Sequence, residues 1–181
     1  MVRSVLEALA ETVELERRTM ALYARFSQIF SDDPKIREFW FEMARDEARH
    51  VGALELVATL LRLRGVDENT SIDVVAFDRA AVERLKTRLE EAARESQDSL
   101  PIQRALEIAV EIEETELEDV VGRLLKSVQQ GDEYERCQRL LVHDLGNLSY
   151  MIERYCDNAA LLQRCDALVN KHAEALSQFE R

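Results

Sequence analysis

Apolar residues recur every three or four positions along most of the chain, and short polar segments divide this pattern into helices. A first helix is predicted from Ser4 to about Phe30, because Ser4 and Glu7 match the capping-box pattern at its start. Its inward stripe consists of Leu6, Leu9, Val13, Met20, Tyr23 and Phe30. A turn is predicted at residues 31–34, and a second helix then extends from Lys35 to about Leu63. So short a connection predicts an antiparallel hairpin over residues 4–63.

The middle of the chain predicts a long connection between this hairpin and a second one. Residues 64–98 contain an irregular stretch and then an amphipathic helix from Arg79 to about Gln97, whose polar side is expected to be a solvated face. This segment is interpreted as a crossover along the outside of the bundle.

The second half of the chain repeats the helical pattern. One helix is predicted from Pro101 to about Gln130, a turn follows, and another helix runs from about Glu133 to Tyr155, which makes a hairpin over residues 99–155. A last helix is predicted over residues 158–179, with His172 as a packed residue rather than a ligand. The pattern therefore predicts one all-α domain over residues 1–181: a four-helix bundle with a crossover helix and an extra C-terminal helix.

Composition agrees with a helical bundle and excludes several classes of function. The chain has 46% hydrophobic and 33% charged residues, but only 5 Gly and 2 Pro. A net charge of −12 argues against nucleic acid or an anionic membrane surface as the main partner. An apolar run long enough to span a membrane and a signal-peptide core are both missing, so a cytoplasmic location is expected. The three cysteines form no C-x-x-C pair and are expected to be reduced, small buried side chains.

Candidate chemistry begins with the segment Asp46-Glu47-Ala48-Arg49-His50 in the second helix. Glu47 and His50 are three residues apart and so lie on one helix face. The rest of that face is apolar: Ile36, Trp40, Met43, Leu54, Val57 and Leu61. Because a buried charge without a partner costs several kcal/mol, partners or a cation are expected nearby.

An internal repeat supplies these partners. Val13-Glu14-Leu15-Glu16 matches Val110-Glu111-Ile112-Glu113, at an offset of 97 residues. The same offset places Glu47 on Asp144 and His50 on Asn147, with apolar positions also aligned. Each of the four long helices thus contributes one inward acid.

The inward acids are predicted to form a metal centre. Four carboxylates in one apolar bundle require counter-charge, which two divalent cations would supply. Carboxylate and imidazole ligands favour iron, manganese or zinc over calcium or copper. The candidate ligands are Glu16, Glu47, His50, Glu113 and Asp144, with Glu116 and Asn147 as weaker candidates one turn further along their helices.

This pattern resembles the ferritin-like superfamily, and the rubrerythrin family most closely. The match rests on Glu16 with Tyr23, on the Asp46–His50 segment, and on Glu113 with Glu116, and it covers about residues 4–155. The resemblance implies a diiron centre that reacts with peroxide or dioxygen. Glu16, Glu47 and His50 would hold the first metal and Glu113 and Asp144 the second, with Glu47 and Asp144 bridging. The chain lacks a rubredoxin-type cysteine motif, so electrons are expected from a separate donor.

The second half departs from the family pattern, because Asp144-Leu145-Gly146-Asn147 stands where a Glu-x-x-His is expected. Aspartate bridges two metals less easily than glutamate, and asparagine is a poor ligand for iron. His143 precedes Asp144 by one residue and is expected at the surface, about 100° around the helix. Tyr23 is expected to fill space rather than to donate a hydrogen bond.

Other interpretations of the same residues stay open. A single metal at Glu16, Glu47 and His50 would suit storage or sensing without turnover. A metal-free interaction module would instead pair its acids with Arg17, Arg49 or lysines. Glu113 and Glu116 could also belong to a solvated acidic run. A homodimer is expected, with the stripe of the last helix packed on its own bundle or on the partner.

Overall fold

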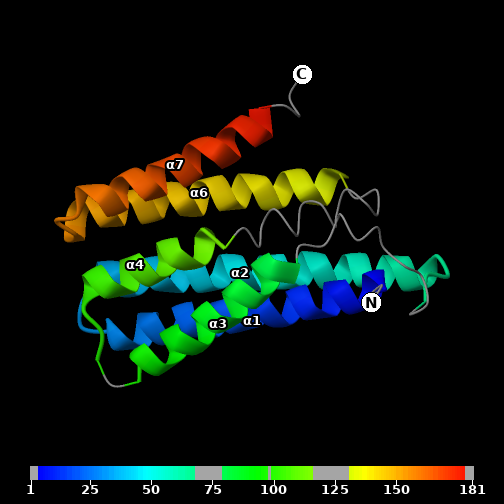
Figure 1. The fold of residues 1–181 in the computed structure, drawn as a ribbon, viewed down its shortest axis with the longest axis horizontal. Coiled ribbons are helices and arrows are strands. Elements are labelled where there is room, and N and C mark those ends of the chain that lie inside the picture. The colour runs from blue at the N-terminus through cyan, green and yellow to red at the C-terminus, as the bar shows by residue number, and fades with distance from the viewer. Residues whose placement is uncertain (1–3, 68–78, 98, 116–130, 178–181) are drawn as a thin grey trace.

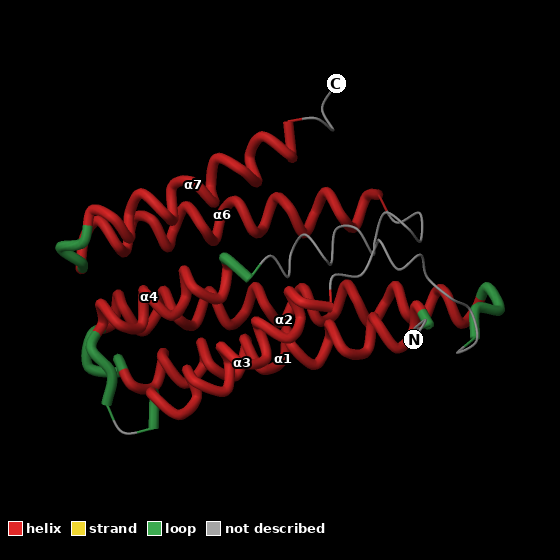
Figure 2. The backbone as a smooth tube through the Cα atoms, viewed as in Figure 1, coloured by secondary structure: helices red, strands yellow, loops and turns green. Residues whose placement is uncertain are grey.

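A computed structural model describes residues 4–67, 79–97, 99–115 and 131–177, except for the side chains of residues 131–134 and 137. Within these ranges all regular structure is helical, which confirms the all-α prediction (Figures 1 and 2). The elements are α1 (Val5–Ile29), α2 (Pro34–Leu63), α3 (Arg79–Glu95), α4 (Ile102–Glu113), α6 (Gly131–Tyr155) and α7 (Ala159–Ser177).

The first hairpin has the boundaries that its capping residues predict. The Ser4 side chain accepts a hydrogen bond from the Glu7 backbone N–H, and the Glu7 side chain accepts one from the Ser4 N–H. The Asp33 side chain caps α2, ahead of Pro34, by accepting hydrogen bonds from the backbone N–H groups of Lys35 and Ile36. After α2, Gly65 adopts a φ of 84°, a conformation that glycine reaches without a Cβ clash. The antiparallel α1 and α2 pack along their length (Figure 1).

An aromatic cluster holds the α1–α2 hairpin together at the end near its turn. Tyr23, Phe26 and Trp40 are completely buried, and the Phe26 and Trp40 rings meet edge to face with centroids 4.8 Å apart. Phe39 adds a fourth ring, 4.7 Å from Trp40. Such rings bury large apolar areas, and their edge-to-face contacts further stabilise the packing of α1 against α2.

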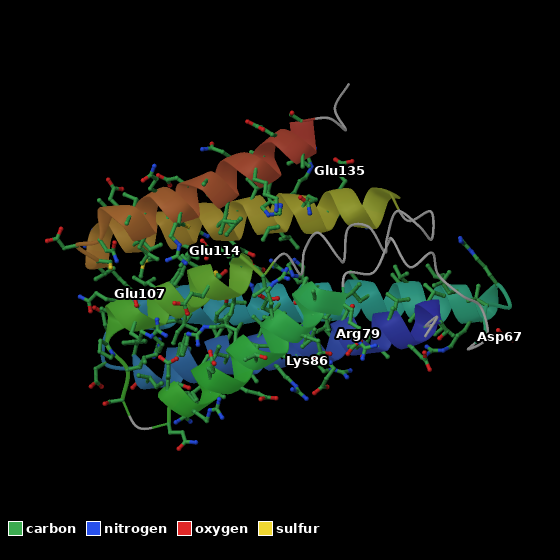
Figure 3. All side chains as sticks on the ribbon, viewed as in Figure 1. Asp67, Arg79, Lys86, Glu107, Glu114 and Glu135 are labelled. Carbon is green, nitrogen blue, oxygen red and sulfur yellow. The ribbon has the colours of Figure 1, made fainter. Side chains whose placement is uncertain are left out.

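The crossover helix α3 packs on α1 and α4, as expected of an amphipathic segment (Figure 1). Its buried face consists of Ala81, Val82, Leu85, Leu89 and Ala92. Ion pairs join its edges to both neighbours: Lys86 to Glu11 of α1, and Arg88 to Glu111 of α4 at 2.6 Å (Figure 3 labels Lys86). The polar side of α3 is therefore partly used in helix-to-helix contacts.

The prediction of one unbroken helix from Pro101 to Gln130 is wrong. The helix α4 ends at Glu113, and Glu114 is its C-cap. At this end the helical hydrogen-bond pattern changes: the Thr115 backbone N–H bonds to the Ile112 carbonyl, three residues back, and the Thr115 hydroxyl donates to the same carbonyl at 2.7 Å. Residues 116–130, which include Glu116, lie outside the described residues.

The last two helices pair with each other and lie against α4 (Figure 1). Leu161, Cys165 and His172 of α7 are buried, so its apolar stripe packs on its own chain. His172 is a packed residue as predicted, with Nδ1 3.3 Å from Gln138 Oε1. Arg164 also bonds to Glu114 at the end of α4 at 2.8 Å. Cys156 is half-buried, and Phe179 lies outside the described residues.

A bilayer crossing would need a long apolar helix, and none occurs among the residues that the structure describes.

Candidate metal centre

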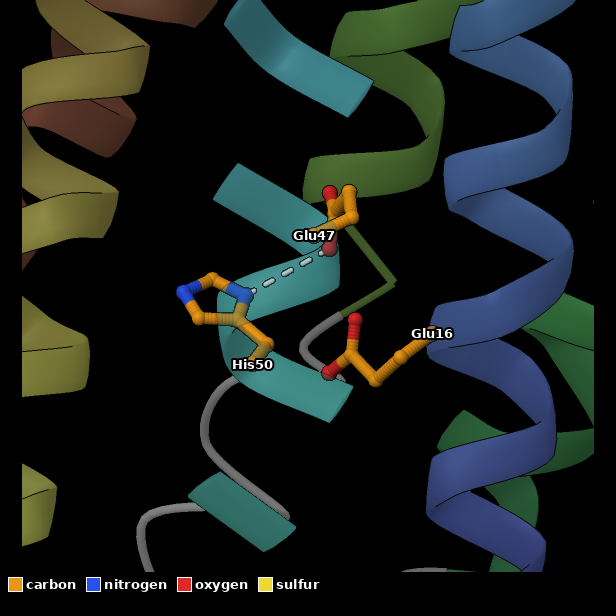
Figure 4. Close-up of side chains that lie close together, drawn as sticks. All are labelled: Glu16, Glu47 and His50. Atoms are coloured by element: carbon orange, nitrogen blue, oxygen red, sulfur yellow. Dashed lines mark ion pairs between the residues drawn. The ribbon is translucent and has the colours of Figure 1, made fainter. Parts of the chain in front are cut away.

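The structure brings Glu16, Glu47 and His50 together at the contact of α1 and α2. One ligand atom from each lies within 4.8 Å of the others, and all three side chains are buried. Glu16 reaches across from α1, while Glu47 and His50 come from successive turns of α2 (Figure 4). Helical periodicity places these polar residues on the inward stripes, and antiparallel packing then makes the stripes meet.

The buried charges of this group include an ion pair within α2. His50 Nδ1 lies 3.4 Å from Glu47 Oε2, the ion pair drawn in Figure 4. The exposed fractions of Glu16, Glu47 and His50 are only 1%, 7% and 4%. Carboxylates so far from water are costly unless positive charge compensates them. A protonated His50 or a bound cation would both provide such charge.

The donor set fits a divalent transition metal. Metal–oxygen and metal–nitrogen bonds of about 2.1 Å place the ligand atoms of a tetrahedral site roughly 3.4 Å apart. Separations of up to 4.8 Å are wider than this by as much as about 1.4 Å, so the side chains would rotate toward a bound ion. Two carboxylates and one imidazole suit iron, manganese and zinc.

Glu113 lies near this group through a contact with Tyr23. The Tyr23 hydroxyl donates to Glu113 Oε1 at 3.1 Å, so the expectation that Tyr23 only fills space is wrong. Burial, followed by the charges of Glu113, Glu47 and Asp144, raises the pKa of Tyr23 well above its ordinary value. The hydroxyl thus stays protonated and donates to an acid from the second hairpin.

We expect Tyr23→Phe to destabilise the protein by about 1–2 kcal/mol, because Glu113 would lose the hydrogen bond that it accepts from the fully buried Tyr23 side chain. Urea unfolding of chelator-treated protein measures this. Tyr150→Phe is the matched control, since Tyr150 is 56% exposed. Equal unfolding free energies for Tyr23→Phe and wild type would contradict the role given to this hydrogen bond.

Asp144 lies in a neighbouring group that sequence reasoning did not find. Its carboxylate, that of Asp46 and the ring of His143 place ligand atoms within 4.8 Å of one another. Asp46 is only 1% exposed, although it precedes Glu47 by one residue and was not expected to face inward. The repeat contained a signal for this pair, because the 97-residue offset that aligns Glu47 with Asp144 also aligns Asp46 with His143.

The carboxyl group of Asp46 influences the protonation of Asp144 in this second group. The pKa of Asp144 is raised to about 8, first by burial and then by the adjacent Asp46 carboxyl. His50 lowers this pKa and Glu113 raises it, which shows that the group is electrostatically linked to the Glu16–Glu47–His50 group.

The remaining candidates are placed as follows. Asn147 is half-buried, and its Nδ2 lies 3.4 Å from His143 Nδ1. His143 is exposed, as predicted, but its Nδ1 also lies 3.1 Å from Asp144 Oδ1. Arg17 pairs with Glu55 and Arg49 with Asp46, so both arginines contact acids outside the Glu16–Glu47–His50 group. Glu116 lies outside the described residues.

Comparisons with family models, with curated proteins and with solved structures gave no match to this chain.

Proposed function

We propose that this chain is a ferritin-like, rubrerythrin-like protein that binds redox-active divalent metal, iron in the first place, and reacts with peroxide or dioxygen. The observation that carries the proposal is the convergence of Glu16, Glu47 and His50 within 4.8 Å at a buried point between two helices. Manganese or zinc would fit the same donors.

Each residue has a defined part in the proposal. Glu16, Glu47 and His50 hold one metal, while Glu113 and Asp144 supply the charge for a second. Bound iron would supply the electrons: two ferrous ions and two protons would convert one hydrogen peroxide into two waters and leave two ferric ions. Tyr23 keeps Glu113 oriented through its hydrogen bond of 3.1 Å. The buried rings of Trp40 and Phe26 exclude water from that side.

External electrons and partners complete the proposal. A separate protein or small reductant would return the ferric ions to the ferrous state. The predicted homodimer stays part of the proposal.

A second candidate function follows from the departure at Asn147. If the second hairpin holds no iron, the protein would bind a single metal and serve storage or sensing without turnover. Asn147 favours this alternative, because its half-buried amide replaces the imidazole that a second iron would need. The metal-free interaction module is the third possibility, and it predicts no bound metal.

One experiment separates these functions. Protein is loaded with Fe²⁺ without oxygen, passed through a desalting column and analysed for iron, and peroxide is then added in steps. The redox proposal expects two iron per chain and loss of two Fe²⁺ for each peroxide, measured with a ferrous chelator. One iron per chain supports storage or sensing, and no retained iron supports the metal-free module. Slow oxidation, at the rate of free Fe²⁺, would contradict redox function even in fully loaded protein.

A further inference from the structure

The two carboxylate oxygens of Asp46 have different surroundings: Oδ1 contacts arginines, whereas Oδ2 has no hydrogen-bond donor among the described residues. Arg49 bonds to Oδ1, and Arg45 Nε lies 3.9 Å from the same oxygen. Oδ2 is buried and receives no hydrogen bond from a donor among the described residues. Its near neighbour is Asp144, which is another carboxyl group. A buried acceptor facing an acid is unfavourable unless a proton or a cation lies between them.

His143 completes this arrangement from the solvent side. One of its ring nitrogens lies within 4.8 Å of a carboxylate oxygen of each aspartate. Its Nδ1 is 3.1 Å from Asp144 Oδ1. Asn147 lies one turn further along α6 and contacts the same ring at 3.4 Å. The imidazole that the repeat lacks at position 147 is therefore present one turn earlier, displaced toward Asp46 of α2.

We infer that Asp46, His143 and Asp144 form a divalent-metal site between α2 and α6, in which His143 takes over the ligand role that Asn147 cannot fill. Two carboxylates and one imidazole match the charge and the softness of Zn²⁺, Fe²⁺ or Mn²⁺. Arg45 and Arg49 hold Oδ1 of Asp46 and so direct Oδ2 toward the metal. His143 is partly open to solvent, which gives the ion a path for entry and positions for water ligands.

This inference rests on the proposed function in one respect, namely that the centre of the bundle takes divalent cations. It differs in the ligands of the second metal, because Asp46 and His143 replace Glu113 as partners of Asp144. It also predicts that the two sites share no ligand, since Glu16, Glu47 and His50 form their own group.

The chain has only 3 histidines, so the test can observe each ring separately. Protein labelled with ¹⁵N-histidine is stripped with a chelator and titrated with Zn²⁺, while ring nitrogen signals are followed by NMR and bound zinc is measured by elemental analysis. We expect the His143 and His50 signals to shift at two zinc per chain, and that of His172, which packs against Gln138, to stay unchanged.

Variants establish which residues act together. Asp46→Asn should weaken the zinc-dependent shift of His143 at least tenfold in affinity and leave that of His50 in place. Glu153→Gln, which makes the same kind of change at an exposed acid of α6, is the matched control and should change neither shift. Circular dichroism of each variant confirms that it folds, and His143→Ala, which alters an exposed side chain, assigns the signal without disturbing the core.

The outcomes separate this inference from the proposed function. A shift of His143 alone supports the inference and overturns the Glu16–Glu47–His50 site. A shift of His50 alone overturns the inference and leaves the first site standing. If neither ring shifts, both are overturned. A His143 shift that persists at full affinity in Asp46→Asn also overturns the inference, because an isolated surface histidine would then explain the binding.

Discussion

Replacing His50 by alanine should cost most of the metal that the first site holds, with affinity falling on the order of 100-fold or more. The change removes the only nitrogen ligand of the Glu16–Glu47–His50 group, and even residues that only orient ligands contribute 10–100-fold in metal sites. Two carboxylates alone hold transition metals less selectively than a mixed set. The measurement is equilibrium dialysis of Fe²⁺ or Zn²⁺ followed by elemental analysis.

Asn147→Ala is the control for this substitution, because the repeat aligns Asn147 with His50. Both residues lie one turn beyond an inward acid, on α2 and on α6 respectively, but only His50 offers a strong ligand. We expect Asn147→Ala to retain wild-type metal content within experimental error. Equal losses in the two variants would contradict the assignment of His50 as a ligand. Glu16→Gln provides a second variant, which should reproduce the His50→Ala loss while keeping the shape of the side chain.

The boundaries of the first hairpin could be predicted because capping residues mark the start of each of its helices. Ser4 and Glu7 mark the start of α1, and Asp33 with Pro34 marks that of α2. The early end of α4 had no comparable signal. There the backbone N–H and the hydroxyl of Thr115 both donate to the Ile112 carbonyl, an arrangement that the spacing of apolar residues does not reveal.

In the candidate site too, residue spacing predicted some of the buried polar residues and not others. Glu16, Glu47 and His50 were predicted because each lies on the one apolar stripe of its helix. Asp46 was not predicted to face inward, because it precedes Glu47 by one residue and so lies about 100° around the helix from that stripe. The helix α2 contacts α1 on one side and α6 on another, so its buried surface is wider than a single stripe. The hydrogen bond of Tyr23 was not predicted either, because its acceptor, Glu113, lies 90 positions away in the sequence.

Chelator-treated protein should lose stability as the pH rises from about 5 to 9, and Asp144→Asn should remove much of that loss. The pKa of Asp144 in the folded protein is raised to about 8, mainly by burial, whereas an unfolded aspartate titrates near ~3.9. Between these values the folded state binds more protons than the unfolded state, so unfolding becomes easier as pH increases. Below the lower pKa the group is protonated in both states and the effect disappears.

The size of the effect follows from the same linkage. A pKa raised from about 3.9 to about 8 sets an upper bound of roughly 5.5 kcal/mol, and we expect about 2 kcal/mol because local rearrangement lowers the cost of ionising Asp144 in the folded state. Asparagine keeps the shape of the side chain and cannot ionise, so the stability of Asp144→Asn relative to wild type should be greater at pH 9 than at pH 5.

Urea unfolding at both pH values, with chelator present, measures this difference. Glu153→Gln is the matched control, since Glu153 is an exposed acid on the same helix, and its difference from wild type should be the same at pH 5 and pH 9. A relative stability of Asp144→Asn that does not increase from pH 5 to pH 9 would contradict the buried acid pair. Adding Zn²⁺ should stabilise wild type more than Asp144→Asn at pH 9, because the ionised Asp144 that destabilises the metal-free fold is the form that binds a cation.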